Sequence, residues 1–298
     1  MEQKQQVKAK RQRKHWMLRW PIPFSLIFPI VMLIATTLAA VLTATVIHHY
    51  FGDKLPQTGN FTEDYVYSPT RIIFSFLIVW IMHRFVMKEW TFGFRKIESW
   101  KEIFIFGWSL IFFGLQNITD GLFFLGKEFV GLNGILLAVI TGFAPGLFEE
   151  VMCRGVVLNN YLYQWKDRPN VIIKGTLFSS VVFGVLHLWN IGNAPVADTL
   201  SQVVYAAGVG VILSAIYLRT GNLWPGILLH AFVDILDSLF IGGIEGNLFT
   251  RVEEILTALI CFGIGLYLIR PAKQQEIKEK IGWIFDQKET EVSQQEQG

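Results

Sequence analysis

Two adjacent carboxylates, Glu149 and Glu150, directly follow the twenty uncharged residues 129–148, and Arg154 comes four residues after the second acid. An ionisable side chain at membrane depth costs about 2.5–3.5 kcal/mol on insertion scales, so such residues mark functional sites. On a helix, Glu150 and Arg154 form an i, i+4 pair with the acid first, which favours an internal ion pair. Glu149 points about 100° away from Glu150, so it must face another helix or water. The doublet therefore predicts one structural acid and one acid that is available as a general base.

Two histidines in other apolar stretches could meet Glu149. His187 comes four residues after Phe183, so its ring can pack on that aromatic side chain. His230 comes four residues before Asp234, whose carboxylate could accept a hydrogen bond from the imidazole and fix its tautomer. At about 1.5 Å per residue, His230, Glu149 and His187 lie about 12, 18 and 22 Å from the cytoplasmic helix ends. We expect them to converge in a cavity that is reached from the cytoplasmic side.

The composition places these residues in a membrane protein. Hydrophobic residues make up 52% of the chain and charged residues only 17%, whereas soluble domains carry about 25% charged residues. Cys153 and Cys261 both lie in apolar stretches, so they predict neither a disulfide framework nor a metal site built on paired cysteines. We interpret them as small buried hydrophobic residues.

The hydropathy pattern predicts an all-α polytopic protein with about eight transmembrane helices, since each span needs about 20 apolar residues. No internal repeat and no separate soluble domain is visible. The expected spans are residues 24–47, 69–87, 103–126, 129–161, 172–190, 199–218, 222–241 and 252–269. The third span carries Gln116, Asn117 and Asp120, and we interpret Asn117 and Asp120 as polar contacts between helices.

The basic residues predict the orientation of these helices. With the N-terminus inside, 22 of the 26 Lys and Arg residues fall in cytoplasmic segments, as the positive-inside rule requires. Both termini are therefore expected in the cytoplasm. The predicted organisation is a basic tail (1–20), N-terminal transmembrane helices (21–128), a catalytic core (129–242), a last transmembrane helix (243–270) and a polar cytoplasmic tail (271–298). That tail has an amphipathic patch around Ile277, Ile281 and Ile284, beyond which we expect disorder.

The three polar segments resemble the motifs of the CPBP family, the CAAX proteases and bacteriocin-processing enzymes, also called the Abi family. The family pattern is EExxxR, FxxxH and HxxxN or HxxxD, in this order. It corresponds here to Glu149-Glu150-x-x-x-Arg154, Phe183-x-x-x-His187 and His230-x-x-x-Asp234. The resemblance covers about residues 130–242, and three motifs in order are far more specific than any one.

The resemblance implies an intramembrane endopeptidase. Glu149 would be the general base that activates water, with His187 as its partner. His230 would stabilise the oxyanion with support from Asp234, while Glu150, Arg154 and Phe183 would support the site structurally. Asp234 stands where the family more often has Asn. An ionised Asp cannot donate a hydrogen bond, so we expect it to accept one ring N–H of His230 and to aim the imidazole at the substrate.

Two alternatives remain at this level. Glu149, His187 and His230 could bind a catalytic zinc with an open fourth position, although no cofactor is needed by a glutamate-base mechanism, which we favour. Alternatively, the same groups could form a proton relay in a transporter, or lie in a non-enzymatic bacteriocin-immunity or scaffold protein. The lack of an inverted repeat argues against the transporter.

The expected partners are a peptide or membrane-protein substrate and the lipid bilayer, and no feature indicates nucleic acid. Short loops and a basic N-terminal tail are typical of a bacterial inner-membrane protein, which argues against a prenylated CAAX substrate. The sequence identifies neither the substrate nor an oligomeric state.

Overall fold

The computed structural model describes residues 20–52, 62–86, 91–124, 128–241 and 248–285. Most of the basic N-terminal tail and the last thirteen residues of the C-terminal tail, for which disorder was expected, lie outside these ranges.

The described chain is helical apart from turns and one pair of two-residue strands. In chain order, the elements are α2 (Pro21–Phe51), η3 (Thr62–Tyr67), α3 (Ser68–Ile81), η4 (Met82–Val86), α4 (Trp100–Thr119), η5 (Asp120–Phe124), β1 (Glu128–Phe129), α5 (Gly131–Glu150), η6 (Val151–Leu158), α6 (Asn159–Trp165), α7 (Val171–Leu186), η7 (His187–Asn190), α8 (Val196–Thr220), α9 (Leu223–Ser238), β2 (Phe240–Ile241), α10 (Leu248–Leu268), η8 (Pro271–Lys273), α11 (Gln274–Lys280) and α12 (Gly282–Phe285). The segments η3 to η6 are π-helical and continue neighbouring α-helices, whereas η7 and η8 are 3₁₀ turns.

The predicted all-α polytopic architecture is confirmed. Within the described ranges, six helices are long and apolar enough to cross a membrane, and a seventh is counted if α10 and the segment Pro271–Lys280, bent by 53°, form one span. Over their described residues the eight expected spans are largely helical, but α9 has only 16 residues. It is about 24 Å long at 1.5 Å per residue, shorter than the roughly 30 Å hydrocarbon core.

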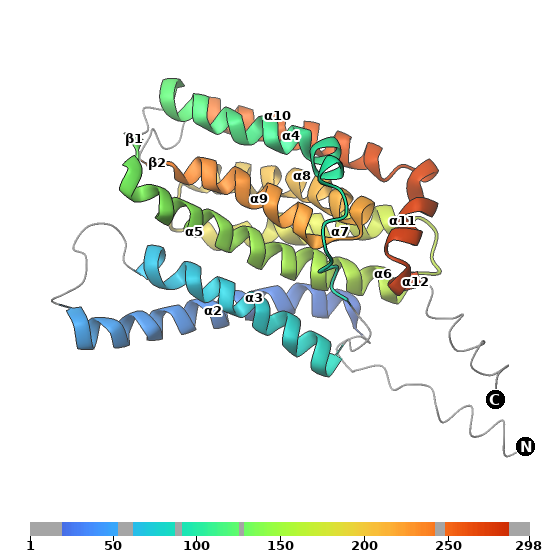
Figure 1. Ribbon diagram of the computed structural model, residues 1–298, viewed down its shortest axis with the longest axis horizontal. Helices are drawn as coiled ribbons and strands as arrows, with labels where there is room; N and C mark the ends of the chain where they lie inside the picture. The colour runs from blue at the N-terminus through green and yellow to red at the C-terminus, as the bar shows by residue number, and fades with distance from the viewer. Residues whose placement is uncertain (1–19, 53–61, 87–90, 125–127, 242–247, 286–298) are drawn as a thin grey trace, which may run out of the picture.

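The helices lie side by side in one elongated bundle (Figure 1). Helices α2 and α3 lie along one side of the bundle and α4 and α10 along the opposite side, with α5 and α9 between them. Strands β1 and β2 pair antiparallel at one end, while α11 and α12 lie at the other. We call these the hairpin end and the tail end.

Two glycines bring α5 close to α9. A Cβ atom added at Gly142 would lie 2.4 Å from the backbone nitrogen of Ile235, and one at Gly146 would lie 2.9 Å from that of Ala231. Small residues spaced four apart allow membrane helices to approach in this way. The contact fixes the first and third motifs relative to one another, because Glu149 follows Gly146 by three residues and Ala231 follows His230.

The start of α9 is held by a cap. Gly221 ends α8 with a positive φ of 63°, a conformation that glycine adopts without steric penalty. The side chain of Asn222 then accepts a hydrogen bond from the backbone N–H of Trp224 (3.0 Å), as an N-cap does. Its amide group donates to the backbone oxygen of Arg95 (3.0 Å). The short helix that carries His230 is therefore fixed at its tail end.

The C-terminal segment closes the tail end of the bundle. The side chains of Ile277, Ile281 and Ile284 are fully buried in the main hydrophobic core. Arg219 at the end of α8 pairs with Glu276 (2.8 Å), which ties α11 to the bundle. The predicted amphipathic patch is thus part of the core, not a surface feature of a polar tail.

Candidate active site

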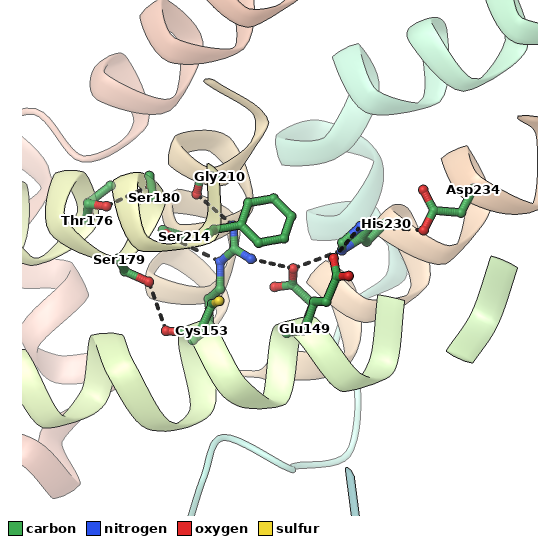
Figure 2. A network of polar contacts seen from close by, with 12 residues as sticks. Glu149, Cys153, Thr176, Ser179, Ser180, Gly210, Ser214, His230 and Asp234 are labelled. Carbon is green, nitrogen blue, oxygen red and sulfur yellow. Dashed lines mark hydrogen bonds and ion pairs between the residues drawn. The ribbon is translucent and has the colours of Figure 1, made fainter. Parts of the chain in front are cut away.

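The first motif forms the expected ion pair, and the pair is completely buried. Arg154 Nη1 lies 2.7 Å from Glu150 Oε1, and both side chains have 0% exposure. The rest of the guanidinium is also satisfied from α8, since Nη2 donates to the carbonyl oxygen of Gly210 (2.9 Å) and Nε to the hydroxyl of Ser214 (3.3 Å) (Figure 2). A buried charge needs such partners, because an unpaired one is strongly destabilising.

The same carboxylate oxygen holds the histidine of the third motif. His230 Nδ1 lies 3.1 Å from Glu150 Oε1 and forms a hydrogen bond with it. A carboxylate only accepts hydrogen bonds, so Nδ1 is the protonated donor. Glu150 thus fixes the orientation of the ring and directs Nε2 away from the buried pair.

The other ring nitrogen of His230 faces two more acids. Its Nε2 lies 3.8 Å from Glu149 Oε2 and 3.5 Å from Asp234 Oδ2. Figure 2 shows Glu149 and Asp234 both close to the His230 ring. The geometry therefore corrects the prediction for Asp234. Glu150, and not Asp234, accepts the N–H that orients the imidazole, while Asp234 and Glu149 both lie near the other ring nitrogen, Nε2. The i, i+4 spacing revealed that His230 and Asp234 meet, but not which nitrogen is involved.

Phe183 connects all three motifs. The Arg154 guanidinium lies over its ring at 4.7 Å, a cation–π arrangement. The rings of His187 and His230 pack edge-on against Phe183, with centroids 5.1 and 5.7 Å away. The motif phenylalanine thereby keeps both imidazoles at fixed angles around one aromatic side chain, and the expected packing of His187 on Phe183 is present.

His187 lies at the junction of α7 and the short turn η7. Its Nδ1 forms a hydrogen bond with the backbone oxygen of Phe183 (2.9 Å), so Nδ1 is the donor and Nε2 is left for other partners. The structure does not pair His187 directly with Glu149. Among the described residues, the side chain closest to the Glu149 carboxylate in an ionic contact is His230. A partnership of Glu149 and His187 would need a water molecule or substrate between them.

The two acids of the doublet differ in their access to a cavity. Glu149 is 18% exposed and lines a cavity of about 490 Å³, whereas Glu150 is 0% exposed. His187, His230 and Asp234 line the same cavity. The structure thus brings the four predicted catalytic residues together around one space, and it separates the available acid from the buried one as expected.

The cavity extends toward the hairpin end, which corrects the expected direction of access. Its lining includes residues from the start of η5, the last turn of α9, the first turns of α10 and η7, and these segments all lie at the hairpin end: Asp120, Asp237, Thr250, Glu253, Trp189 and Asn190. The tail end is closed by α11 and α12. With the termini in the cytoplasm, as predicted, the cavity would open on the outer side of the membrane.

Several lining residues were missed or misread in the sequence. Arg71, near the start of α3, lines the cavity, and its Nη2 donates to the hydroxyl of Tyr67 (3.3 Å). Glu253 and Glu254, at the start of the last long helix, also line it. A second acidic doublet at a helix end was the available signal. Asn117 connects helices as predicted, through the backbone oxygen of Val233 (3.3 Å), whereas no such contact is found for Asp120 among the described residues. Gln116 also connects helices, since its amide donates to Glu253 (2.6 Å).

The described acids and histidines of the cavity do not converge as ligands of a metal ion would. Among the described residues, no group of three or more His, Cys, Asp and Glu side chains could hold a metal ion. Of the three candidate zinc ligands, His230 already uses Nδ1 for Glu150, and its Nε2 is shared between two carboxylates. Zinc ligands normally converge at about 2.0–2.2 Å from the ion, so these residues do not fit the zinc site. Cys153 and Cys261 are buried and free.

The fold and the cavity together define a class: a polytopic membrane protein whose acids and histidines meet inside the helix bundle. A family comparison is more specific. Residues 131–236, about a third of the chain, match the family described as Type II CAAX prenyl endopeptidase Rce1-like. This segment contains all three motifs, and the match confirms the resemblance to the CPBP and CAAX protease family. At the level of the family it supports a CAAX-type intramembrane protease. No curated protein and no solved structure matches the chain.

Proposed function

We propose that the protein is an intramembrane endopeptidase that cleaves a peptide bond with a water molecule activated by Glu149. The observation that carries this proposal is the division of the doublet: Glu150 is buried and its Oε1 is bound by both Arg154 and His230, while Glu149 faces the cavity within 4 Å of His230 Nε2. A general base needs this combination of access and a neighbouring hydrogen-bonding group.

In the proposed step, the Glu149 carboxylate takes a proton from water as the water oxygen bonds to the carbonyl carbon. In its charged form, His230 donates from both nitrogens. Nδ1–H is bound by Glu150, and Nε2–H is directed to the developing oxyanion. The tetrahedral intermediate then collapses, the C–N bond breaks, and the proton held by Glu149 passes to the leaving amine. The products are a carboxylic acid and an amine, which become a carboxylate and an ammonium group when the acid's proton passes to the amine.

The remaining residues position these groups. Arg154 neutralises Glu150 and fixes the position of this acid, which accepts the hydrogen bond from His230 Nδ1. Asp234 lies beside Nε2, where its carboxylate can draw the N–H toward the cavity before the substrate carbonyl arrives. His187, with Nδ1 committed to Phe183, has Nε2 available to hold the attacking water against Glu149.

Membrane peptidomics would test the activity and name the substrate. Cells that carry Glu149→Gln would be compared with the parent and with a Glu128→Gln strain, which loses an exposed acid on β1. We expect one or more uncleaved peptides to accumulate only in the Glu149→Gln strain. An unchanged peptidome would contradict the protease and leave the non-enzymatic immunity or transport alternatives.

We also propose that both termini face the cytoplasm of a bacterial cell, so that the cavity opens outward. Cysteine labelling tests this orientation, and the two native cysteines should contribute little signal because Cys153 and Cys261 are buried. A cysteine at Asn193, exposed in the turn between η7 and α8, should react with an impermeant thiol reagent added to intact cells. One at Ser99, before α4, should react only after permeabilisation. The reverse pattern would invert the topology.

A further inference from the structure

The part of the cavity nearest the hairpin end is strongly acidic. We call the carboxylates there the acidic mouth: Asp120, Asp237, Glu253 and Glu254. Together with Glu149 and Asp234, six carboxylates line the cavity, and Arg71 is the only Lys or Arg among the described residues that line it. Acids gathered in a space with low-dielectric walls raise the local concentration of cations.

Asp120 indicates that this acidity serves a ligand. Its side chain is only 6% exposed and lines the cavity, yet it makes no hydrogen bond or ion pair with another described residue. A buried carboxylate without a partner is costly, and natural structures supply such groups with a counter-charge or keep them for function. Glu253 differs, because the amide of Gln116 already binds it. The unmatched charge at Asp120 is therefore free to bind a group that enters the cavity.

The arrangement suits an organic cation better than a metal ion. Within the described part of the chain, no three carboxylates or histidines could hold a metal ion together. Acids spread over η5, α9 and α10 match instead the several donors of an ammonium or guanidinium group, which form strong charge-assisted hydrogen bonds with carboxylates. A peptide entering from the hairpin end must pass these acids before it reaches His230.

Resting on the proposed protease function, we propose that the acidic mouth binds a lysine or arginine side chain of the substrate. The position follows from helix geometry. Asp237 lies seven residues beyond His230 on α9, which is about 10 Å at 1.5 Å per residue. An extended peptide advances about 3.3 Å per residue, so the basic residue lies about three positions from the scissile bond. The mouth thereby selects among peptides before the chemical step.

Purified full-length protein in detergent tests this selection with pooled, internally quenched decapeptides. In separate pools each position is fixed in turn as lysine, norleucine or glutamate, and cleavage sites are read by mass spectrometry. We expect lysine about three residues from the cleaved bond to raise kcat/KM about tenfold over norleucine, or about 1.4 kcal/mol, and glutamate to lower it. Norleucine controls for the apolar stem of lysine.

Asp120→Asn and Asp237→Asn should each reduce the lysine-to-norleucine ratio, and Asp120→Lys should reverse the preference toward glutamate. Glu128→Gln removes a charge at the same end outside the cavity and should leave the ratio unchanged. The ratio is measured within one preparation, so it does not depend on how much of a variant folds. A wild-type protein without charge preference, or variants that keep the full preference, would overturn the acidic mouth.

The two proposals fail in different ways. If Glu149-dependent cleavage occurs with equal rates for lysine and norleucine peptides, the protease stands and the acidic mouth does not. If Glu149→Gln cleaves these peptides as well as the wild-type protein, the proposed catalytic base is wrong whatever the charge preference.

Discussion

The two sides of the His230 ring differ in almost every physical respect. On the Nδ1 side, Glu150 and Arg154 are fully buried, and a carbonyl and a hydroxyl from α8 complete the guanidinium contacts. On the Nε2 side, Glu149 and Asp234 are partly exposed to a cavity and lie beyond ordinary hydrogen-bond distance. One side is closed and centred on two short contacts to Glu150 Oε1, while the other is open and incompletely paired.

This difference assigns stability to the residues on one side of the imidazole and chemistry to the residues on the other. A buried hydrogen-bonded network fixes the geometry of the site but is out of reach of a substrate. An open pair of acids, in contrast, can exchange protons with water. Preorganised donors are effective because they need no reorganisation when charge develops. The closed side therefore supplies the rigidity, and the open side supplies the reactive groups.

The largest effect expected on the closed side follows from Arg154→Leu. The change strands the buried Glu150 carboxylate and leaves the Gly210 carbonyl and Ser214 hydroxyl without their donor. Breaking a buried pair in this way should destabilise the fold by about 3–5 kcal/mol, measured as a lower thermal midpoint and less monodisperse protein. Ser214→Ala removes one weak hydrogen bond and should lose only about 1 kcal/mol. Equal stability of Arg154→Leu and the parent would contradict a structural ion pair.

His230→Ala should act mainly on the open side. Glu150 keeps its salt bridge to Arg154, so the protein should still fold, but the donor for the oxyanion is lost. Removing one such donor reduces kcat by about 10²- to 10³-fold, measured on a peptide cleaved by the parent. His83→Ala, an exposed histidine in η4, is the matched control and should be silent. Full activity of His230→Ala would remove His230 from the mechanism.

Asp234 should give a smaller and more selective effect. Asp234→Ala removes the acid that lies beside Nε2 and should reduce kcat about tenfold, or about 1.4 kcal/mol. Asp234→Asn should keep most activity, because the amide carbonyl can still accept a hydrogen bond. The closed side should be untouched, so both variants should melt like the parent. If Asp234→Asn were as inactive as Asp234→Ala, the negative charge and not the acceptor would be the requirement.

Chelation should have the smallest effect. Because His230 Nδ1 is bound by Glu150 and no metal-holding cluster occurs among the described residues, purified protein should stay active after prolonged treatment with a chelator. The activity of treated protein would be compared before and after adding zinc. Reversible loss with recovery on zinc would turn Glu149, His187 and His230 into candidate ligands and merge the two sides of the ring into one metal centre.

The sequence predicted features that depend on one helix at a time. Apolar runs located the helices to within a few residues, as for α8, expected at 199–218 and found at Val196–Thr220. The ion pair of Glu150 with Arg154 was also predictable, because residues four apart share a helix face. These contacts need no knowledge of how helices pack.

Features that depend on packing between helices were not predictable. The contact of Glu150 with His230 joins residues 80 apart and depends on the close approach of α5 and α9 at Gly142 and Gly146. The predicted direction of access to the cavity does not match the structure, because counting residues gives the depth of a side chain along a helix but not which end of the bundle is closed. The tail end is closed by Ile277, Ile281 and Ile284. The sequence predicted an amphipathic patch on a polar tail for these residues, because it does not show the core side chains against which they pack.

The difference between the two sides of His230 is tested most directly by Glu149→Gln and Glu150→Gln, each measured for activity per folded molecule and for thermal midpoint. Glu149→Gln should keep the midpoint and lose activity by about 10²- to 10⁴-fold, the range of a general base. Glu150→Gln should lower the midpoint by several degrees, because it removes one charge of a buried pair, while the molecules that fold retain measurable activity. Activity in Glu149→Gln would contradict the assignment of Glu149 as the general base. An unchanged midpoint together with complete inactivity in Glu150→Gln would contradict the assignment of Glu150 as the structural acid.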